Sequence, residues 1–389
     1  MIYLDNAATT QIKPEVLDAM IPYLQNNYGN AGSLYSLGSI SKKAIAEARE
    51  SVANLLHCKP EQVIFTSGGS ESNNLAIFGL LDYFKQKRKT HIIYSPVEHD
   101  SVINAIDGFC KTYDFYSSET SVSSNGVVIP KYVKDKMRPT TGLVSVMYVN
   151  NETGSENEIM EIAKLCSEND VLFHTDCVQA AGTHTIDIDQ IGCDLLSISS
   201  HKIHGPKGVG ALFVRDTSLI NPLIYGGHEQ EFGLRAGTEN VAGIVGFGKA
   251  CEIVSQNLRE NDIYMSMLKQ VFYQCLAENL DKHGLKDVMH INGEPVVKHG
   301  KTLNIRFDGV DSETLILMLD AFGICISAGS ACRSYESQPS HVLLAMGLDP
   351  DSARDSVRIS FSVLNTLEEI TSAAKQIAEC VKLLSRKGG

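Results

Sequence analysis

The stretch 195-LLSISSHKIHGPKG-208 is the most informative part of the sequence for the fold. A short apolar run ends there in a cluster of polar residues. Residues 195–199 are typical of a buried strand, and Lys202 follows the end of that strand directly. A lysine held at a half-buried strand end loses hydration, which disfavours its ammonium form and makes the amine a better nucleophile. Most lysines are solvated surface charges. Lys202 alone therefore has two interpretations, a surface charge or a reactive amine.

The composition is that of an ordinary globular protein, with 43% hydrophobic and 21% charged residues. A length of 389 residues predicts two domains. The net charge of -12 and the lack of a Lys/Arg-rich tract argue against a nucleic-acid-binding surface. No basic leader with an apolar segment is visible, and no apolar run is long enough to span a bilayer. We expect a cytoplasmic enzyme or binding protein, with no nucleic-acid or membrane partner.

Cysteine and histidine spacing argues against disulfides and metal. The ten cysteines are scattered, with no C-x-x-C pair, so we expect mostly reduced and inert thiols. His201 and His204 could form a metal-binding pair, but no third ligand has a suitable spacing. We therefore predict no metal site.

Strand-like runs alternate with helical patterns through the first two thirds of the chain. The predicted strands are 63–66, 91–95, 143–149, 171–175 and 195–199, with helices at 71–81 and from about 100. This alternation indicates a mainly parallel sheet that is covered on both faces. Each strand ends in polar residues, and ligands of such sheets bind at the carboxyl ends of the strands. These polar clusters should converge in space.

The pattern changes near residue 251 to long helical periodicity. We predict a helix over 251–280, a strand over 302–307, a helix over 312–322 and a final helix over 367–384. The expected organisation is α/β, with a large domain over 15–255 and a smaller α+β domain formed by 1–14 and 256–389.

The segment 66-TSGGSESNN-74 follows a strand and begins a helix. Its glycines allow a close approach to an anion, and the free N–H groups of a first helical turn bind phosphate. Ser70 can act as an N-cap, as a phosphate ligand, or as both. The segment lacks the Gly-Lys-Ser/Thr ending of a Walker A loop.

Two further strand ends carry candidate site residues. Asp176 can keep a pyridinium nitrogen protonated, or it can be the N-cap of a helix. His99 can stack on an aromatic ring and exchange protons, or it can be a histidine satisfied near a helix start.

Together with Lys202, these pieces resemble the fold-type I pyridoxal-phosphate (PLP) enzymes, and more narrowly the cysteine desulfurases of the NifS/IscS type. The resemblance runs nearly from end to end in the family's order. Its strings are YLDNAATT (3–10), SGGSESNN (67–74), VNNETG (149–154), SHKIHGPKGVG (within 199–210), GGHEQE (226–231), RAGTEN (235–240) and SAGSACRS (327–334). It implies a transferase fold, with a mainly parallel seven-stranded sheet in the large domain and a smaller α+β C-terminal domain.

The resemblance also implies roles for matching residues. Those implied to hold PLP are Lys202 through a Schiff base, Asp176 at the pyridinium nitrogen, His99 and Val178 on the two ring faces, Gln179 at the ring hydroxyl oxygen, and Gly69, Ser70, Ser199 and His201 at the phosphate.

Three more residues match the family's ligand-binding positions. Thr238 matches a phosphate ligand that the partner subunit donates, which implies a homodimer with shared sites. Asn151, also counted among the cofactor-binding residues, and Arg358 match the residues that bind the substrate carboxylate. An arginine suits that task because its guanidinium meets a carboxylate with two parallel hydrogen bonds. The alternative for Arg358 is a structural salt bridge.

Cys332 lies among small residues in SAGSACRS, beside Arg333, which can lower the pKa of an exposed thiol. The resemblance implies that Cys332 attacks the sulfur of the substrate cysteine and becomes a persulfide. The segment 334–340 resembles the long version of the family's loop, which carries sulfur to an acceptor protein, such as an iron–sulfur scaffold or a tRNA-thiolation protein.

The implied reaction is a PLP-dependent conversion of L-cysteine to L-alanine, with the sulfur left on Cys332. Lys202 would move protons at the substrate, and His99 would take the thiol proton. One alternative is a selenocysteine lyase on the same scaffold. Another is a PLP-binding sulfur-relay protein without turnover, against which the intact Lys202, His99, Asp176 and Cys332 argue.

Two positions depart from the family pattern. Ser70 stands where threonine is frequent, and it keeps the hydroxyl. Cys177 stands where alanine is usual, so it is either a small packing residue or a thiol that approaches the cofactor.

Overall fold

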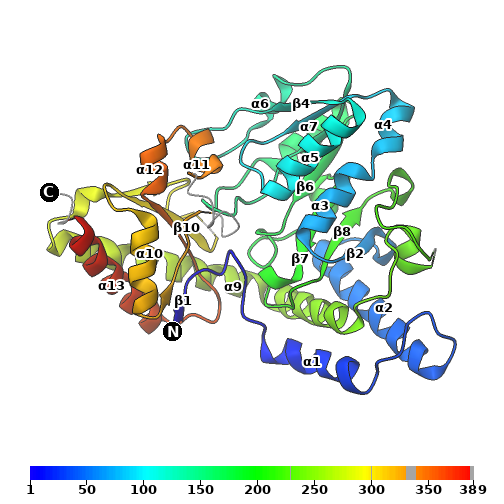
Figure 1. The fold of residues 1–389 in the computed structure, drawn as a ribbon, viewed down its shortest axis with the longest axis horizontal. Coiled ribbons are helices and arrows are strands. Elements are labelled where there is room, and N and C mark those ends of the chain that lie inside the picture. The colour runs from blue at the N-terminus through cyan, green and yellow to red at the C-terminus, as the bar shows by residue number, and fades with distance from the viewer. Residues whose placement is uncertain (228, 299, 330–338, 386–389) are drawn as a thin grey trace.

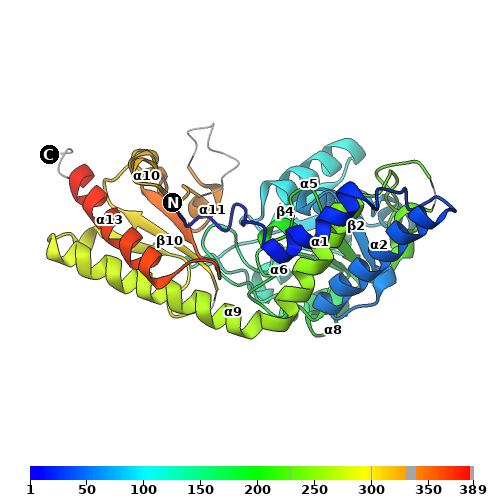
Figure 2. The same ribbon diagram turned by 90° about the horizontal axis from the view of Figure 1, so that it is seen from below.

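The computed structural model describes residues 1–227, 229–298, 300–329 and 339–385. Two lobes lie side by side and are joined by the long helix α9 (Val241–Lys282), which runs beneath both of them (Figures 1 and 2). The larger lobe contains the seven-stranded sheet, and the smaller lobe contains both the N-terminus and the last helix (Figure 1).

The main sheet has the strand order β2-β8-β7-β6-β5-β3-β4. Its strands are β2 (Val63–Thr66), β3 (His91–Tyr94), β4 (Tyr116–Glu119), β5 (Thr141–Ser145), β6 (Leu172–Asp176), β7 (Leu195–Ser199) and β8 (Gly210–Val214). Strand β8 is antiparallel to both of its neighbours, and the other pairings are parallel. The prediction of a mainly parallel seven-stranded sheet in an α/β fold is therefore confirmed.

Adjacent residues of the strands contribute to different core groups, because successive side chains of a strand point to opposite faces. Ile64 and Leu212 pack in one group, and Phe65 and Phe213 pack in the other. The first group includes residues of α3 (Gly69–Phe78), α4 (Leu81–Lys87) and α5 (Asp100–Tyr113). The second includes residues of α2 (Ser36–Leu56), α7 (Ile159–Glu168), α8 (Ile188–Ile191) and the first half of α9. Helices thus cover both faces of the sheet.

The smaller lobe has its own core. Strands β9 (Met289–Asn292), β10 (Thr302–Phe307) and β12 (Ser356–Ser360) form an antiparallel sheet, and β1 (Ile2–Tyr3) pairs in parallel with β11 (Ile324–Cys325). Helices α10 (Ser312–Ala321), α13 (Leu367–Ser385) and the second half of α9 pack against them. Four shorter or peripheral helices are α1 (Pro14–Gln25), α6 (Pro130–Lys134), α11 (His341–Ala345) and α12 (Pro350–Arg354).

The buried residues of α9 pack into the core of the larger lobe before the predicted domain boundary and into the core of the smaller lobe after it. Phe247 and Val254 belong to the core of the larger lobe, whereas Leu268 and Phe272 belong to the core of the smaller one. The predicted boundary between residues 255 and 256 lies between these two sets. The division into domains stays a prediction, which this pattern of burial supports.

Several predicted elements have the observed bounds and others do not. The strands at 63–66, 195–199 and 302–307 coincide with β2, β7 and β10. The helix expected over 71–81 begins at Gly69 and ends at Phe78. The helix expected over 251–280 begins ten residues earlier at Val241, where the Asn240 side chain accepts a hydrogen bond from the Gly243 N–H.

A buried ion pair fixes the segment 230–233 onto strand β2. The guanidinium of Arg49 contacts both carboxylate oxygens of Glu231, at 2.7 and 2.6 Å, and Glu231 also accepts from the Phe65 N–H at 2.7 Å. The rings of Phe65 and Phe232 lie 4.6 and 5.0 Å from the guanidinium. Glu231 and Phe232 have φ values of 44° and 57°, a left-handed conformation that these contacts hold in place.

We predict that Glu231→Ala lowers the free energy of unfolding by about 3–5 kcal/mol, because it leaves the buried Arg49 charge without a partner. Asp351→Ala is the control: Asp351 pairs with Arg354 at the surface, and its side chain is 91% exposed, so its loss should leave stability unchanged. Urea denaturation of the holoproteins measures both. Equal urea midpoints for Glu231→Ala and Asp351→Ala would contradict the stabilising role assigned to the Arg49–Glu231 pair.

Candidate active site

A cavity of about 210 Å³ lies between the lobes, at the carboxyl ends of β6 and β7 and the N-terminus of α3. It brings together every predicted site residue except two. The predicted residues that line it are Gly69, Ser70, His99, Asn151, Asp176, Val178, Gln179, Ser199, His201, Lys202 and Arg358. The convergence expected from the polar strand ends is therefore observed.

The remaining two predicted residues are Cys332 and Thr238. Cys332 lies outside the described residues. Thr238 is exposed and lines a separate hollow with Ser67, Gly208 and Arg235. Thr238 is thus not among the residues that line this chain's own cavity.

Lys202 lies in the short 3-10 turn Ser200–Lys202 that follows β7 directly. Its Nζ donates hydrogen bonds to the backbone carbonyls of Ala7 and Ala8, each at 2.7 Å. The side chain is therefore held inside the cavity by the N-terminal segment. Lys202 had two interpretations, a surface charge or a reactive amine. These contacts exclude a solvated surface charge.

Asp176 is the last residue of β6 and is almost fully buried. Its Oδ2 accepts from the Asn73 carboxamide at 2.8 Å, and its Oδ1 accepts from the Val178 N–H at 2.9 Å. No helix begins at Asp176, so it is not a helix N-cap. The carboxylate is instead fixed at the wall of the cavity.

Glu98 is fully buried close to Asp176 and was not singled out in the sequence. Its Oε1 accepts from the Met147 N–H at 2.7 Å. Burial, and to a lesser extent the Asp176 charge, raise the pKa of Glu98 to about 8. Glu98 is therefore protonated at neutral pH and adds no negative charge beside Asp176.

His99 is satisfied at a helix start, as one of its two interpretations held, and its position at the cavity is compatible with the other. It is the N-cap of α5, where its Nδ1 accepts from the Ser101 N–H at 3.1 Å, and it also lines the cavity. Because Nδ1 accepts from a backbone donor, the neutral ring carries its proton on Nε2.

The loop before α3 has the geometry of an anion cradle. Gly68 has a φ of 151°, and a Cβ on Gly210 would lie 2.8 Å from the Gly68 Cα, so both positions require glycine. The first turn of α3, whose N–H groups have no partner within the helix, lies at the cavity beside Ser199. Burial, and then the charges of Lys202, Lys207 and Lys301, lower the pKa of His201 to about 4, so its ring is neutral.

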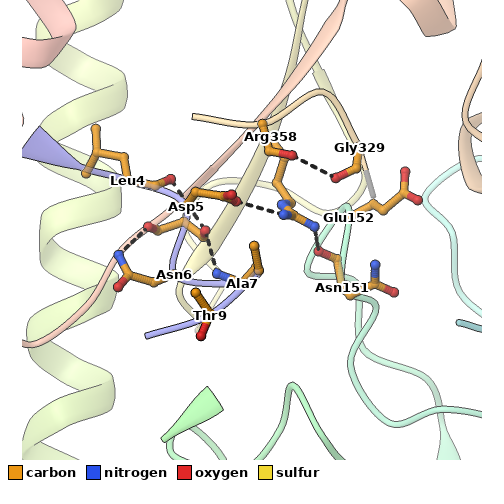
Figure 3. A network of polar contacts seen from close by, with 12 residues as sticks. Leu4, Asp5, Asn6, Ala7, Thr9, Asn151, Glu152, Gly329 and Arg358 are labelled. Carbon is orange, nitrogen blue, oxygen red and sulfur yellow. Dashed lines mark hydrogen bonds and ion pairs between the residues drawn. The ribbon is translucent and has the colours of Figure 1, made fainter. Parts of the chain in front are cut away.

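Arg358 is both a salt-bridge residue and a cavity residue (Figure 3). Its guanidinium contacts Asp5 Oδ1 at 2.7 Å and donates to the Asn151 carbonyl at 3.0 Å. Only 2% of the residue is exposed, and its Nε has no hydrogen-bond partner among the described residues. The predicted alternative, a structural salt bridge, therefore coexists with a position at the cavity.

The structure bears on the cofactor contact expected for Gln179 and on the two interpretations of Cys177. The Gln179 Nε2 donates to the Ala7 carbonyl at 2.9 Å, and its buried Oε1 has no partner within the described part of the chain. Cys177 is fully buried in the core of the larger lobe and does not line the cavity. Cys177 is thus a packing residue, as one of the two interpretations held.

Several lining residues were missed in the sequence. They are Ala7, Ala8, Asn73, Ser101 and Met147. Asn73 had a detectable signal, because it lies three residues after Ser70 and therefore on the same helix face. Ala7 and Ala8 act through their backbone carbonyls, and no side-chain pattern reports that contact.

Residues 2–372 match the aminotransferase class-V family, and the chain belongs to that family. It is 39% identical to the cysteine desulfurase IscS of Methanosarcina thermophila, over 98% of this chain and 92% of that protein. It is 41% identical to the putative cysteine desulfurase IscS 1 of Bacillus subtilis, over 99% of each chain.

Solved structures agree with this assignment. A NifS-like protein superposes with a TM-score of 0.88 at 33% identity, covering 99% of both chains. The structure of SspA in complex with cysteine gives a TM-score of 0.78 at 33% identity, covering 94% of this chain and 100% of that one. In the described part of this chain, no helix is long and apolar enough to cross a membrane.

His174, two residues before Asp176 on β6, provides a test of burial at the site. Its ring nitrogens contact the hydroxyls of Ser145 at 2.8 Å and Ser197 at 3.2 Å. Full burial lowers the pKa of His174 from 6.5 to about 4. The unfolded chain therefore binds the proton first as the pH falls from 6.5 to 4, so this histidine makes the folded state less stable in that interval.

We predict that His174→Gln reduces the loss of stability between pH 6.5 and 4 by about 1.4 kcal/mol per pH unit. Urea denaturation at a series of pH values measures the slope. Between pH 7 and 8 the two proteins should give parallel lines, which is the internal control. A variant whose slope between pH 6.5 and 4 equals that of the wild type would contradict the neutral buried state.

Proposed function

We propose that this protein is a PLP-dependent cysteine desulfurase, which converts L-cysteine to L-alanine and leaves the sulfur as a persulfide on Cys332. The observation that carries the proposal is the gathering of Lys202, Asp176, His99 and Arg358 around one cavity. Relatives named cysteine desulfurase, similar over nearly the whole chain, support it.

The residues around the cavity fit PLP. The Gln179 Oε1 and the Arg358 Nε are buried polar atoms without partners among the described residues, which a polar ligand would satisfy. A Cβ on Gly69 would lie 3.0 Å from Val178 Cγ2, so the glycine keeps the space beside Val178 open.

The ring and the phosphate of PLP would have separate binding groups. Those proposed for the ring are Lys202, Asp176, His99, Val178 and Gln179, with Asn151 beside them, and those for the phosphate are Gly69, Ser70, Ser199 and His201. When bound, PLP supplies an electron sink for negative charge that develops on the substrate.

Asp176 would hold a proton at the pyridinium nitrogen. Asn73 and the Val178 N–H fix the two carboxylate oxygens, and the protonated Glu98 leaves Asp176 as the anion at that end of the cavity. An ionised carboxylate stabilises the protonated nitrogen.

Lys202 would act as the general base and acid at the substrate α-carbon. The Ala7 and Ala8 carbonyls keep its Nζ within the cavity, where it would transfer the proton. Arg358, oriented by Asp5, and Asn151 would bind the substrate carboxylate.

Cys332 would accept the sulfur. Its thiolate attacks the substrate sulfur, a new S–S bond forms, and the C–S bond breaks, with its electron pair left on the substrate carbon. That carbon then takes up a proton to give alanine, and His99 would receive the thiol proton. Glu152 supports this assignment, because it accepts from the Ser340 hydroxyl and lies close to Gly329, beside Asn151 (Figure 3).

A homodimer and a sulfur-acceptor protein complete the proposal. Large apolar side chains are exposed near the segment that carries Thr238, including Tyr225 at 80% and Phe232 at 54%. Exposed apolar patches of this kind are typical of subunit interfaces. Thr238 would reach the cavity of the partner subunit, and the persulfide would pass to an acceptor such as an iron–sulfur scaffold or a protein of tRNA or thio-cofactor synthesis.

We predict that Cys332→Ala abolishes sulfide release from cysteine and retains the visible absorption of bound PLP, because only the sulfur acceptor is removed. Sulfide and alanine are measured with a thiol reductant present. Cys58→Ala, which removes a thiol at the end of α2, should keep wild-type release. Normal sulfide release by Cys332→Ala would refute the persulfide assignment.

We predict that Lys202→Ala loses the covalent attachment of PLP that borohydride reduction makes permanent. Mass spectrometry after reduction should show the added mass on the wild type and on Lys207→Ala, an exposed lysine five residues further along. An added mass on Lys202→Ala equal to that of the wild type would exclude Lys202 as the attachment residue.

A further inference from the structure

Lys301, directly before β10, is a buried lysine that the proposed reaction does not use. Only 6% of the residue is exposed. Its Nζ donates to the backbone carbonyl of Lys202 at 3.4 Å, and no other hydrogen bond of this amine is formed with the described residues. A protonated lysine has three N–H donors, so most of its hydrogen-bonding capacity is left over.

The charges around Lys301 are positive. Lys202 and Arg358 are the charged groups that most affect it, and no carboxylate of the described residues lies within ion-pair distance. Burial, and then these two cations, lower the pKa of Lys301 to about 7. The Lys301 charge in turn lowers the pKa of His201 and of His204. A buried charge without a counter-ion is unfavourable.

A second buried lysine of this chain has carboxylates near its amine, as buried lysines usually do. Lys269, on α9, donates to the Lys298 carbonyl at 2.7 Å and is equally well buried. The charges that act on it are those of Asp262, Glu156 and Glu294, which favour its ammonium form. Lys269 therefore has carboxylates around it, and Lys301 has none.

A small cavity of about 20 Å³ adjoins Lys301 at the junction of the two lobes. Its size suits a single water-sized occupant. Lys13 and Asn261 also line it, and their side chains form no hydrogen bond within the described part of the chain. The unused groups around the cavity are thus rich in donors, and three lysines line it, Lys13, Lys202 and Lys301.

The other polar groups of this cavity are satisfied. The His204 Nδ1 donates to the Gln11 carbonyl at 2.8 Å, so its Nε2 accepts from the Ser362 hydroxyl at 3.2 Å. The Thr10 hydroxyl donates to the His201 carbonyl and accepts from the His204 N–H. None of these groups supplies the negative charge that Lys301 lacks.

We propose that this cavity binds a small monovalent anion of the halide class, held by Lys301 together with Lys13 and Asn261. The small volume of the cavity favours a halide over the larger sulfate and phosphate ions. The anion neutralises the charge of Lys301, which belongs to the smaller lobe, and Lys13 belongs to the segment that leads into the larger lobe. The site shares one lining residue, Lys202, with the proposed PLP site, and its other lining residues are different.

Thermal unfolding of the holoenzyme at pH 6.5 tests the proposal. Sodium chloride or bromide is compared with sodium gluconate at equal ionic strength. Wild type should show a saturable rise in Tm of about 1–2 °C with halide, because a ligand that binds the folded state stabilises it. Lys269→Met should show the same rise, and Lys301→Met should show none. A wild-type Tm that does not respond to halide, or an equal rise in Lys301→Met, would overturn the proposal.

Crystals of the wild-type holoenzyme grown in sodium bromide give a test that needs no variant. The expected result is an anomalous bromide peak in contact with Lys301 Nζ. Water density at that position, in crystals that show bromide peaks elsewhere, would refute the anion site. This measurement decides the question even where Lys301→Met does not fold.

Discussion

The backbone carbonyls of Ala7 and Ala8 are the acceptors on which the position of Lys202 depends. The segment that carries them is fixed from both lobes. The Asn6 carboxamide donates to the Ser360 carbonyl of β12, and the Thr10 N–H donates to the His201 carbonyl beyond β7. A half-buried ammonium requires acceptors, and here they come from the N-terminal segment of a chain whose lysine lies almost two hundred residues later. The cavity therefore exists only when both lobes and this segment are assembled.

Charge at the junction of the lobes is arranged so that cations outnumber anions. Lys202 and Arg358 are close enough to act on Lys301, and Arg358 forms an ion pair with Asp5 (Figure 3). Glu98 is protonated and His201 is neutral. The net result is a positive field at a buried position, which favours anionic groups such as a phosphate or a carboxylate. The same excess of positive charge leaves Lys301 without a counter-ion.

Much of the fold could be predicted because the strands are short apolar runs that end in polar residues, as in β2, β7 and β10. The start of α9 was missed because its first turns are rich in glycine, which argues against a helix. The structure gives the reason for one of these glycines: a Cβ on Gly248 would lie 2.6 Å from the Ala48 Cα, so glycine is what allows α9 to pack closely against α2. A tertiary contact of this kind has no local signal.

Prediction of the candidate site from the sequence was limited in the same way, because tertiary contacts leave no local signal. Side chains at strand ends, such as Asp176 and His99, could be identified as candidates, but their alternatives were separated only by the contacts of the folded chain. The backbone acceptors at Ala7 and Ala8 could not be predicted at all, since an alanine carbonyl carries no chemical signature in the sequence.

Glu152 fixes two segments of the smaller lobe beside the cavity. Only 1% of Glu152 is exposed, Gly329 lies against its carboxylate, and the Ser340 hydroxyl donates a hydrogen bond to the same group. Asn151, its neighbour in the chain, lines the cavity. Cys332 stands between Gly329 and Ser340 in the sequence, so these two contacts support its proposed role as the sulfur acceptor.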